Sequence, residues 1–136
     1  MDISARKSTS ASNIEESVIL VVEDDPQVAR LIALVLGRNG YESEVVADGR
    51  TAMSRARDKK PELIFADLSI EGMGGQALCS ALKEQPETAG IPFIVVSGDR
   101  DVAEKARICG ADDYMGKPFE FDDLVRLVKK YARTQS

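Results

Sequence analysis

Short runs of β-branched and other apolar residues alternate along the sequence with longer stretches that have one apolar face. Three runs are apolar throughout, as in strands buried on both faces of a sheet: 18–22, 63–66 and 93–96. Two weaker strands are expected at 41–47, which Glu42 and Glu44 interrupt, and at 113–115. Helices are expected from Pro26 to Asn39-Gly40, at 49–59, at 76–84, at 101–109 and in a last helix ending near Tyr131. The pattern predicts five strands and five helices in alternation.

Strands that alternate with helices favour an α/β fold, in which helices cover both faces of a parallel sheet. The three apolar strands should be central, whereas the charged strand at 41–47 and the short strand at 113–115 should form the edges. With right-handed crossovers, these edges require the winding to reverse between the first and third strands. Ligands bind at the carboxyl ends of strands beside such a reversal, so a functional site is expected there.

The chain of 136 residues is long enough for one domain, which is expected at 18–133. Residues 1–17 are rich in serine and other polar side chains, and we expect a flexible lead-in rather than a signal peptide. Because little sequence follows the last helix, no output domain is expected. The longest apolar run, at 31–36, is far shorter than the ~20 residues of a membrane span. A cytoplasmic location is therefore expected.

Charge and composition exclude several classes of function. The net charge of −5 argues against general binding to nucleic acids or acidic membranes. The sequence contains no histidine, which excludes Ser-His-Asp catalysis, histidine-ligated metals and a phosphohistidine within this chain. Cys79 and Cys109 are too few for a disulfide framework and are expected to be free and buried in helices. Any chemistry must therefore depend on carboxylates, hydroxyls and lysine.

Polar residues follow the central strands where each strand ends. The first strand ends in Glu23-Asp24-Asp25, the third in Asp67, the fourth in Ser97, and the fifth runs into Lys117. Carboxylates gathered at one edge raise each other's pKa unless a cation neutralises them. Oxygen ligands suit Mg²⁺, and Mn²⁺ could take its place. A lysine and a hydroxyl opposite a metal-bound carboxylate suit a phosphoryl group. The sequence thus predicts an aspartate that accepts a phosphoryl group with the help of Mg²⁺.

Four segments in this order resemble a known family. The segments VILVVEDDP, PELIFADLSIEGMGG, IPFIVVSGD and GADDYMGKPF are similar to the successive motifs of the receiver domain of two-component response regulators. The resemblance extends from Val18 to Tyr131 and is strong because the motifs are linked. It implies a flavodoxin-like (βα)5 three-layer sandwich with the strand order 2-1-3-4-5.

The resemblance also implies roles for the charged residues. Asp67 would be the phosphoacceptor, and Lys117 would contact the phosphoryl group. Asp24 would hold Mg²⁺ directly and Glu23 through water, together with Asp67 itself and the backbone carbonyl of Ser69.

Two further roles concern switching. Ser97 would turn inward to bond the phosphoryl oxygen, and the rotamer of Tyr114 would follow its movement. The Lys117–Pro118 peptide bond would be cis.

The implied function is that of a stand-alone, single-domain response regulator. It would accept a phosphoryl group from a histidine kinase or a histidine phosphotransfer protein, catalysing its own phosphotransfer and autodephosphorylation without being an enzyme for other substrates. The helix at 101–109, the strand at 113–115 and the last helix would form the face that acts on a downstream protein, and this face could also pair with a second copy. The main alternative is a protein-binding scaffold that never needs phosphate; a flavodoxin-like electron carrier and an aspartate-dependent hydrolase fit less well.

Each site residue also has a structural interpretation. Asp24 and Asp25 could cap the helix that begins near Pro26, and Asp67 could be a turn residue. Ser97 could satisfy local backbone groups. Lys117 and Tyr114 could be an ordinary surface lysine and an edge aromatic, and the glycines of GMGG could serve turn geometry.

Two residues depart from the family pattern. Glu71 stands where the family usually has proline, and Asp99 adds a second negative charge near the site. They predict an unusual rate of dephosphorylation. A half-life equal to that of a Glu71→Pro variant would remove the argument for Glu71.

Overall fold

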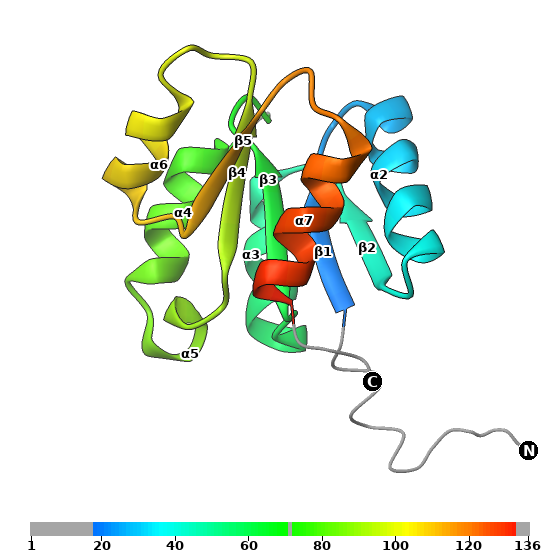
Figure 1. Cartoon of the computed structure of the whole chain (residues 1–136). Coiled ribbons are helices and arrows are strands. Elements are labelled where there is room, and N and C mark those ends of the chain that lie inside the picture. Colours follow the sequence, from blue (N-terminus) through cyan, green and yellow to red (C-terminus); the bar gives the residue numbers. More distant parts are fainter. Residues whose placement is uncertain (1–17, 71, 133–136) are drawn as a thin grey trace, which may run out of the picture.

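The computed structural model of the chain describes residues 18–70 and 72–132 (Figure 1). The strands are β1 (Val18–Val22), β2 (Glu42–Val46), β3 (Leu63–Asp67), β4 (Phe93–Ser97) and β5 (Asp113–Gly116). The helices are α2 (Pro26–Arg38), α3 (Gly49–Lys59), α4 (Gly75–Lys83), α5 (Pro86–Ala89), α6 (Val102–Cys109) and α7 (Phe121–Tyr131). The expected lead-in at 1–17 and residue 133 lie outside the described residues.

The strands form one parallel sheet in the order β2-β1-β3-β4-β5. This confirms the α/β fold class, the two edge strands and the reversal of winding between β1 and β3. Helices α2 and α7 lie on one face of the sheet, and α3, α4 and α6 lie on the other (Figure 1). Since all strands run the same way, their carboxyl ends meet at one edge.

The central strands have apolar runs because the side chains on their two faces pack into two separate hydrophobic cores. On β1, Ile19 and Val21 pack toward α2 and α7, whereas Leu20 and Val22 pack toward α3, α4 and α6. All four of these side chains are buried. Alternate residues of a strand point to opposite faces, so a strand covered on both sides has no position for a solvated side chain.

Helix α5 is a difference from the sequence-based prediction, which had no helix between 84 and 93. Its four residues are too few to show a helical period. Tertiary hydrogen bonds hold this region: Thr88 Oγ1 donates to the Leu82 carbonyl at 2.7 Å, and Lys83 Nζ donates to the carbonyls of Ala89 and Ile91 at 3.1 and 2.9 Å. Such contacts become visible only once the chain is folded.

The two cysteines are free and buried, as predicted, in α4 and α6. Burial raises the pKa of the Cys79 thiol, which keeps it protonated and unreactive. Both side chains belong to the core between the sheet and these helices.

No helix among residues 18–70 and 72–132 is long and apolar enough to cross a membrane.

Asp25 caps α2, and its replacement by alanine should destabilise the fold by about 1 kcal/mol. Its Oδ1 accepts hydrogen bonds from the backbone N–H groups of Gln27 and Val28, at 2.9 and 3.4 Å. Asparagine caps helices as well as aspartate does, so Asp25→Asn should keep most of the stability that Asp25→Ala loses. Urea unfolding of the two variants checks this, and equal losses for both would contradict the role as a cap.

Candidate functional site

The residues predicted at the strand ends lie at one edge of the sheet. Asp67 is the last residue of β3 and Ser97 the last of β4, while Glu23 directly follows β1 and Lys117 directly follows β5. Backbone hydrogen bonds extend the sheet into this rim: Glu23 N–H donates to the Val46 carbonyl at 3.0 Å, and Lys117 N–H donates to the Ser97 carbonyl at 2.9 Å. The sheet topology therefore fixes the backbone position of each of these residues.

Lys117 joins two buried carboxylates. Its ammonium donates to Asp67 Oδ2 at 2.5 Å and to Glu23 Oε1 at 3.3 Å. Glu23 and Asp67 are each only 5% exposed. Two buried negative charges thus share one positive charge, which leaves the group with a net negative charge in a poorly solvated place.

The pKa values of the three groups reflect this arrangement. Burial alone would raise the pKa of Asp67, but hydrogen bonds from Lys117 and Ser69 outweigh it, and the pKa is lowered. Burial dominates for Glu23, whose pKa is raised in spite of Lys117. Burial would lower the pKa of Lys117, but Asp67 and Glu23 raise it. Of the two buried carboxylates, Asp67 is therefore the one that stays ionised more readily, as a nucleophile must.

Ser69 holds the other oxygen of Asp67. Its backbone N–H and its hydroxyl both donate to Asp67 Oδ1 at 2.8 Å. The sequence prediction gave Ser69 only a metal-binding carbonyl and missed these bonds; the available signal was a serine two residues after an aspartate, a spacing at which aspartate accepts backbone hydrogen bonds. Asp67 Oδ1 thus accepts two hydrogen bonds, whereas Oδ2 accepts one from Lys117 and keeps a free lone pair.

The acidic run after β1 divides into separate roles. Asp25 caps α2, and its backbone N–H donates to Glu23 Oε2 at 3.1 Å, which orients the Glu23 side chain. The side chain of Asp24 is exposed and makes no hydrogen bond to the described residues. Among those residues, no three acidic, cysteine or histidine side chains converge closely enough to enclose a metal ion.

Ser97 is buried at the rim, and its hydroxyl accepts a hydrogen bond from the Asp99 N–H at 3.0 Å. This bond agrees with the prediction that Ser97 could satisfy a local backbone group. Within the described part of the chain, the Ser97 hydroxyl has no hydrogen bond to Asp67. The Asp99 carboxylate pairs with Lys105 at 2.8 Å, so its charge near the site is partly neutralised.

Tyr114 lies on β5 and is 46% exposed. It pairs in register with Val95, two residues before Ser97. Its role in switching stays a prediction.

Glycines shape the loop that follows Asp67. A Cβ atom at Gly75 would come within 2.5 Å of the Asp67 carbonyl oxygen, so α4 can begin this close to β3 only with glycine there. Gly72 has a φ of +76°, a conformation that favours glycine. These positions confirm that glycines of GMGG serve backbone geometry. Glu71 lies outside the described residues, and the predicted effect of its charge stays a prediction.

The Lys117–Pro118 peptide bond is cis, as expected from the resemblance.

A parallel α/β domain with an aspartate, a second carboxylate and a lysine at its switch point has the architecture of a signalling receiver. The chain belongs to the response regulator receiver domain family, whose model matches residues 19–129. Among curated relatives, the DNA-binding response regulator MtrA of Mycolicibacterium smegmatis is 34% identical over 117 residues, which are 85% of this chain and 50% of that protein. The phosphate regulon transcriptional regulatory protein PhoB of Rhizobium meliloti is 33% identical, over 85% of this chain and 52% of that protein. The chain spans about half the length of these relatives.

Solved structures agree with the family. The signal receiver domain of a histidine kinase from Syntrophus aciditrophicus has a TM-score of 0.75 and 35% identity, covering 88% of this chain and 96% of that one. The receiver domain of a sensor histidine kinase from Pseudomonas aeruginosa, solved with a magnesium ion coordinated in its active-site cleft, has a TM-score of 0.79 and 26% identity, covering 85% of this chain and 96% of that one.

Proposed function

We propose that this receiver domain accepts a phosphoryl group on Asp67 from the phosphohistidine of a histidine kinase or a histidine phosphotransfer protein. The observation that carries the proposal is the buried, readily ionised Asp67 carboxylate bonded to the Lys117 ammonium. A structural ion pair would need neither a second buried carboxylate beside it nor a location at the sheet's switch point. The proposal concerns residues 18–132 and holds whether or not they belong to a longer chain.

The transfer is a displacement at phosphorus. An Asp67 oxygen forms the new P–O bond as the P–N bond of the donor phosphohistidine breaks, and the electron pair of that bond returns to the imidazole of the partner. Lys117 already bonds Asp67 Oδ2, so its ammonium lies where it can offset the negative charge on the transferring group. Ser97 can donate its hydroxyl to a phosphoryl oxygen once it turns from the Asp99 N–H.

The donor set of the rim fits a magnesium ion. Mg²⁺ binds through one or two carboxylates and keeps several waters, so it does not need three enclosing side chains. Asp24 and Asp67 with the carbonyl of Ser69 would hold it, and Glu23 would act through water. When bound, the ion supplies positive charge that neutralises the phosphoryl oxygens. Glu23 and Asp67 carry two negative charges against the one positive charge of Lys117, so the rim can accommodate a further cation.

The output face comprises α6, β5 and α7. Ile108 on α6 and Tyr114 on β5 are 62% and 46% exposed, so apolar side chains of this face are accessible to a partner. We propose that phosphorylation shifts the conformation of this face, through Ser97 and Tyr114, and so changes its affinity for a downstream protein or a second copy of the chain.

A phosphoryl mimic tests the proposal without a kinase. Beryllofluoride with Mg²⁺ should raise the melting temperature by about 5 °C, because a ligand that binds only the folded state stabilises it. Mg²⁺ alone should have a smaller effect, and chelation should abolish the response. The same melting temperature with and without the mimic would favour a scaffold that works without phosphate.

A further inference from the structure

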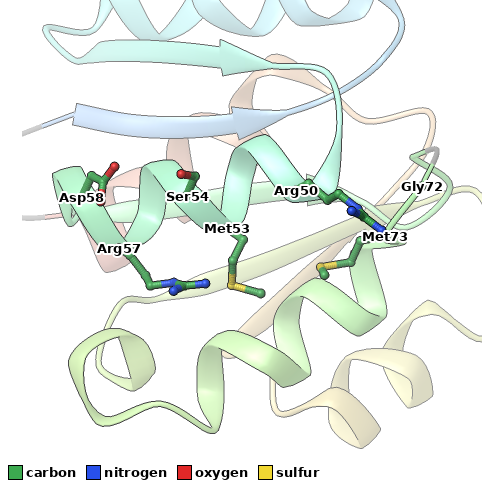
Figure 2. Close-up of a pocket in the computed structure, with 7 residues that line it drawn as sticks. All are labelled: Arg50, Met53, Ser54, Arg57, Asp58, Gly72 and Met73. Atoms are coloured by element: carbon green, nitrogen blue, oxygen red, sulfur yellow. The ribbon is translucent and has the colours of Figure 1, made fainter.

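A groove of about 790 Å³ lies apart from Asp67, between α3 and the segment that leads into α4 (Figure 2). Its lining residues are Arg50, Met53, Ser54, Arg57, Asp58, Gly72 and Met73. Figure 2 shows the Met53 and Met73 side chains pointing into the space between the two walls. None of these residues has a part in the proposed phosphotransfer.

The two walls of the groove are held at a fixed separation. The backbone carbonyl of Met73 packs against the first residue of α3 so closely that a Cβ atom at Gly49 would lie 2.2 Å from its oxygen. The groove is therefore a built feature of the fold. Met53 belongs to the core and is 9% exposed, and Met73 is half-buried against that core, so the two side chains form the apolar floor of the groove. Methionine side chains adapt to the shape of what they contact.

The lining of the groove is slightly basic although the chain is acidic, because it carries two arginines, Arg50 and Arg57, and one aspartate, Asp58. Arg55 is used within the fold, since it pairs with Glu44 at 2.8 Å. Arg50 and Arg57 form no ion pair with the described residues. Both side chains are exposed, so their charge is available to a partner.

The spacing of these residues defines the partner. Arg50, Met53 and Arg57 lie at positions i, i+3 and i+7 of α3 and share one stripe, with the backbone positions of the two arginines about 10 Å apart along the axis. We infer that the groove binds an acidic amphipathic helix of another protein, with an apolar side chain on Met53 and Met73 and a carboxylate on each arginine. Asp58 opposes the second carboxylate and weakens the interaction.

Methyl NMR of the methionines tests this inference directly. The probe is a synthetic helical peptide with a central leucine pair and two glutamates seven positions apart on the same face. It should shift the methyl resonances of Met53 and Met73. The Met115 methyl, buried under the opposite face of the sheet, should not move. A peptide with lysine in place of the two glutamates should leave all the resonances unchanged.

Charge variants sharpen the test. Exposed ion pairs are individually weak, so R50Q/R57Q should weaken peptide binding about tenfold and R55Q should leave it unchanged. Asp58→Asn should strengthen binding, and added salt should weaken it. The inference would be overturned if the Met53 and Met73 resonances did not shift at saturating peptide. It would also be overturned if R55Q and R50Q/R57Q weakened peptide binding equally. Shifts caused equally by phosphatidylserine vesicles would likewise overturn it, since they would indicate a general anionic surface.

Discussion

The Asp67→Asn variant is expected to incorporate no phosphoryl group from acetyl phosphate or from a histidine kinase. An amide oxygen is not a nucleophile at neutral pH, so the loss should be complete to the detection limit. The substitution keeps the shape of the side chain, and its oxygen can still accept both hydrogen bonds from Ser69. Intact-protein mass spectrometry measures the incorporation.

Asp58→Asn is the matched control. Asp58 is an exposed acid on α3, and it has no part in the proposed phosphotransfer. This variant should reach the phosphorylation stoichiometry of the unmodified chain. Labelling of Asp67→Asn to that same stoichiometry would show that another residue accepts the phosphoryl group.

Replacing Lys117 by methionine should slow phosphorylation about 100-fold, the usual cost of losing one group that stabilises transition-state charge. It should also destabilise the fold by about 3 kcal/mol at neutral pH, because Glu23 and Asp67 are left buried without their counter-charge. Lys129→Met, at an exposed position of α7, should change stability by less than about 0.5 kcal/mol. Urea unfolding in the presence of a chelator measures the stability of both variants.

The stability loss in Lys117→Met should depend on pH. In the unmodified chain the pKa of Asp67 is lowered, so its ionised form stabilises the fold above the ordinary carboxyl pKa, and this contribution is lost as the pH falls. The pKa of Lys117 is raised, so its contribution is present below the ordinary lysine pKa and lost only at higher pH. Glu23, with a raised pKa, costs stability when ionised.

Loss of Lys117 should raise the pKa of both carboxyl groups relative to the unmodified chain, because Lys117 lowers each of them. Protonation then removes the uncompensated buried charge. The deficit of Lys117→Met should therefore be largest near neutral pH and shrink as the pH falls to about 4. Added Mg²⁺ should restore part of the stability at neutral pH, since it replaces the missing positive charge. A deficit that is constant between these pH values would mean that Lys117 acts through packing alone.

The central strands and the residues at their carboxyl ends could be predicted, because a strand buried on both faces has a continuous run of apolar residues in the sequence. The wholly apolar runs at β1, β3 and β4 can be satisfied only in the middle of a sheet covered on both sides, and this position fixes where Asp67 and Ser97 lie. The capping role of Asp25 could likewise be derived from the proline that follows it.

Contacts between distant side chains could not be predicted. Lys117 and Glu23 are 94 positions apart, and their hydrogen bond depends on rotamers that only the folded chain defines. The same holds for Lys83 and Asp112, which are 29 positions apart and form an ion pair at 2.8 Å. The basic groove was missed for a different reason: Met73 lies far from α3 in the sequence, and only the tight approach at Gly49 brings it to Met53.

The most direct test of Asp67 as the phosphoacceptor is to locate the phosphoryl group chemically. After incubation with acetyl phosphate and Mg²⁺, borohydride reduces an aspartyl phosphate to homoserine, and peptide mass spectrometry identifies the reduced residue. We predict homoserine at position 67 and nowhere else. Homoserine at position 24 or 99, or a stable phosphate on a serine with an unmodified Asp67, would contradict it.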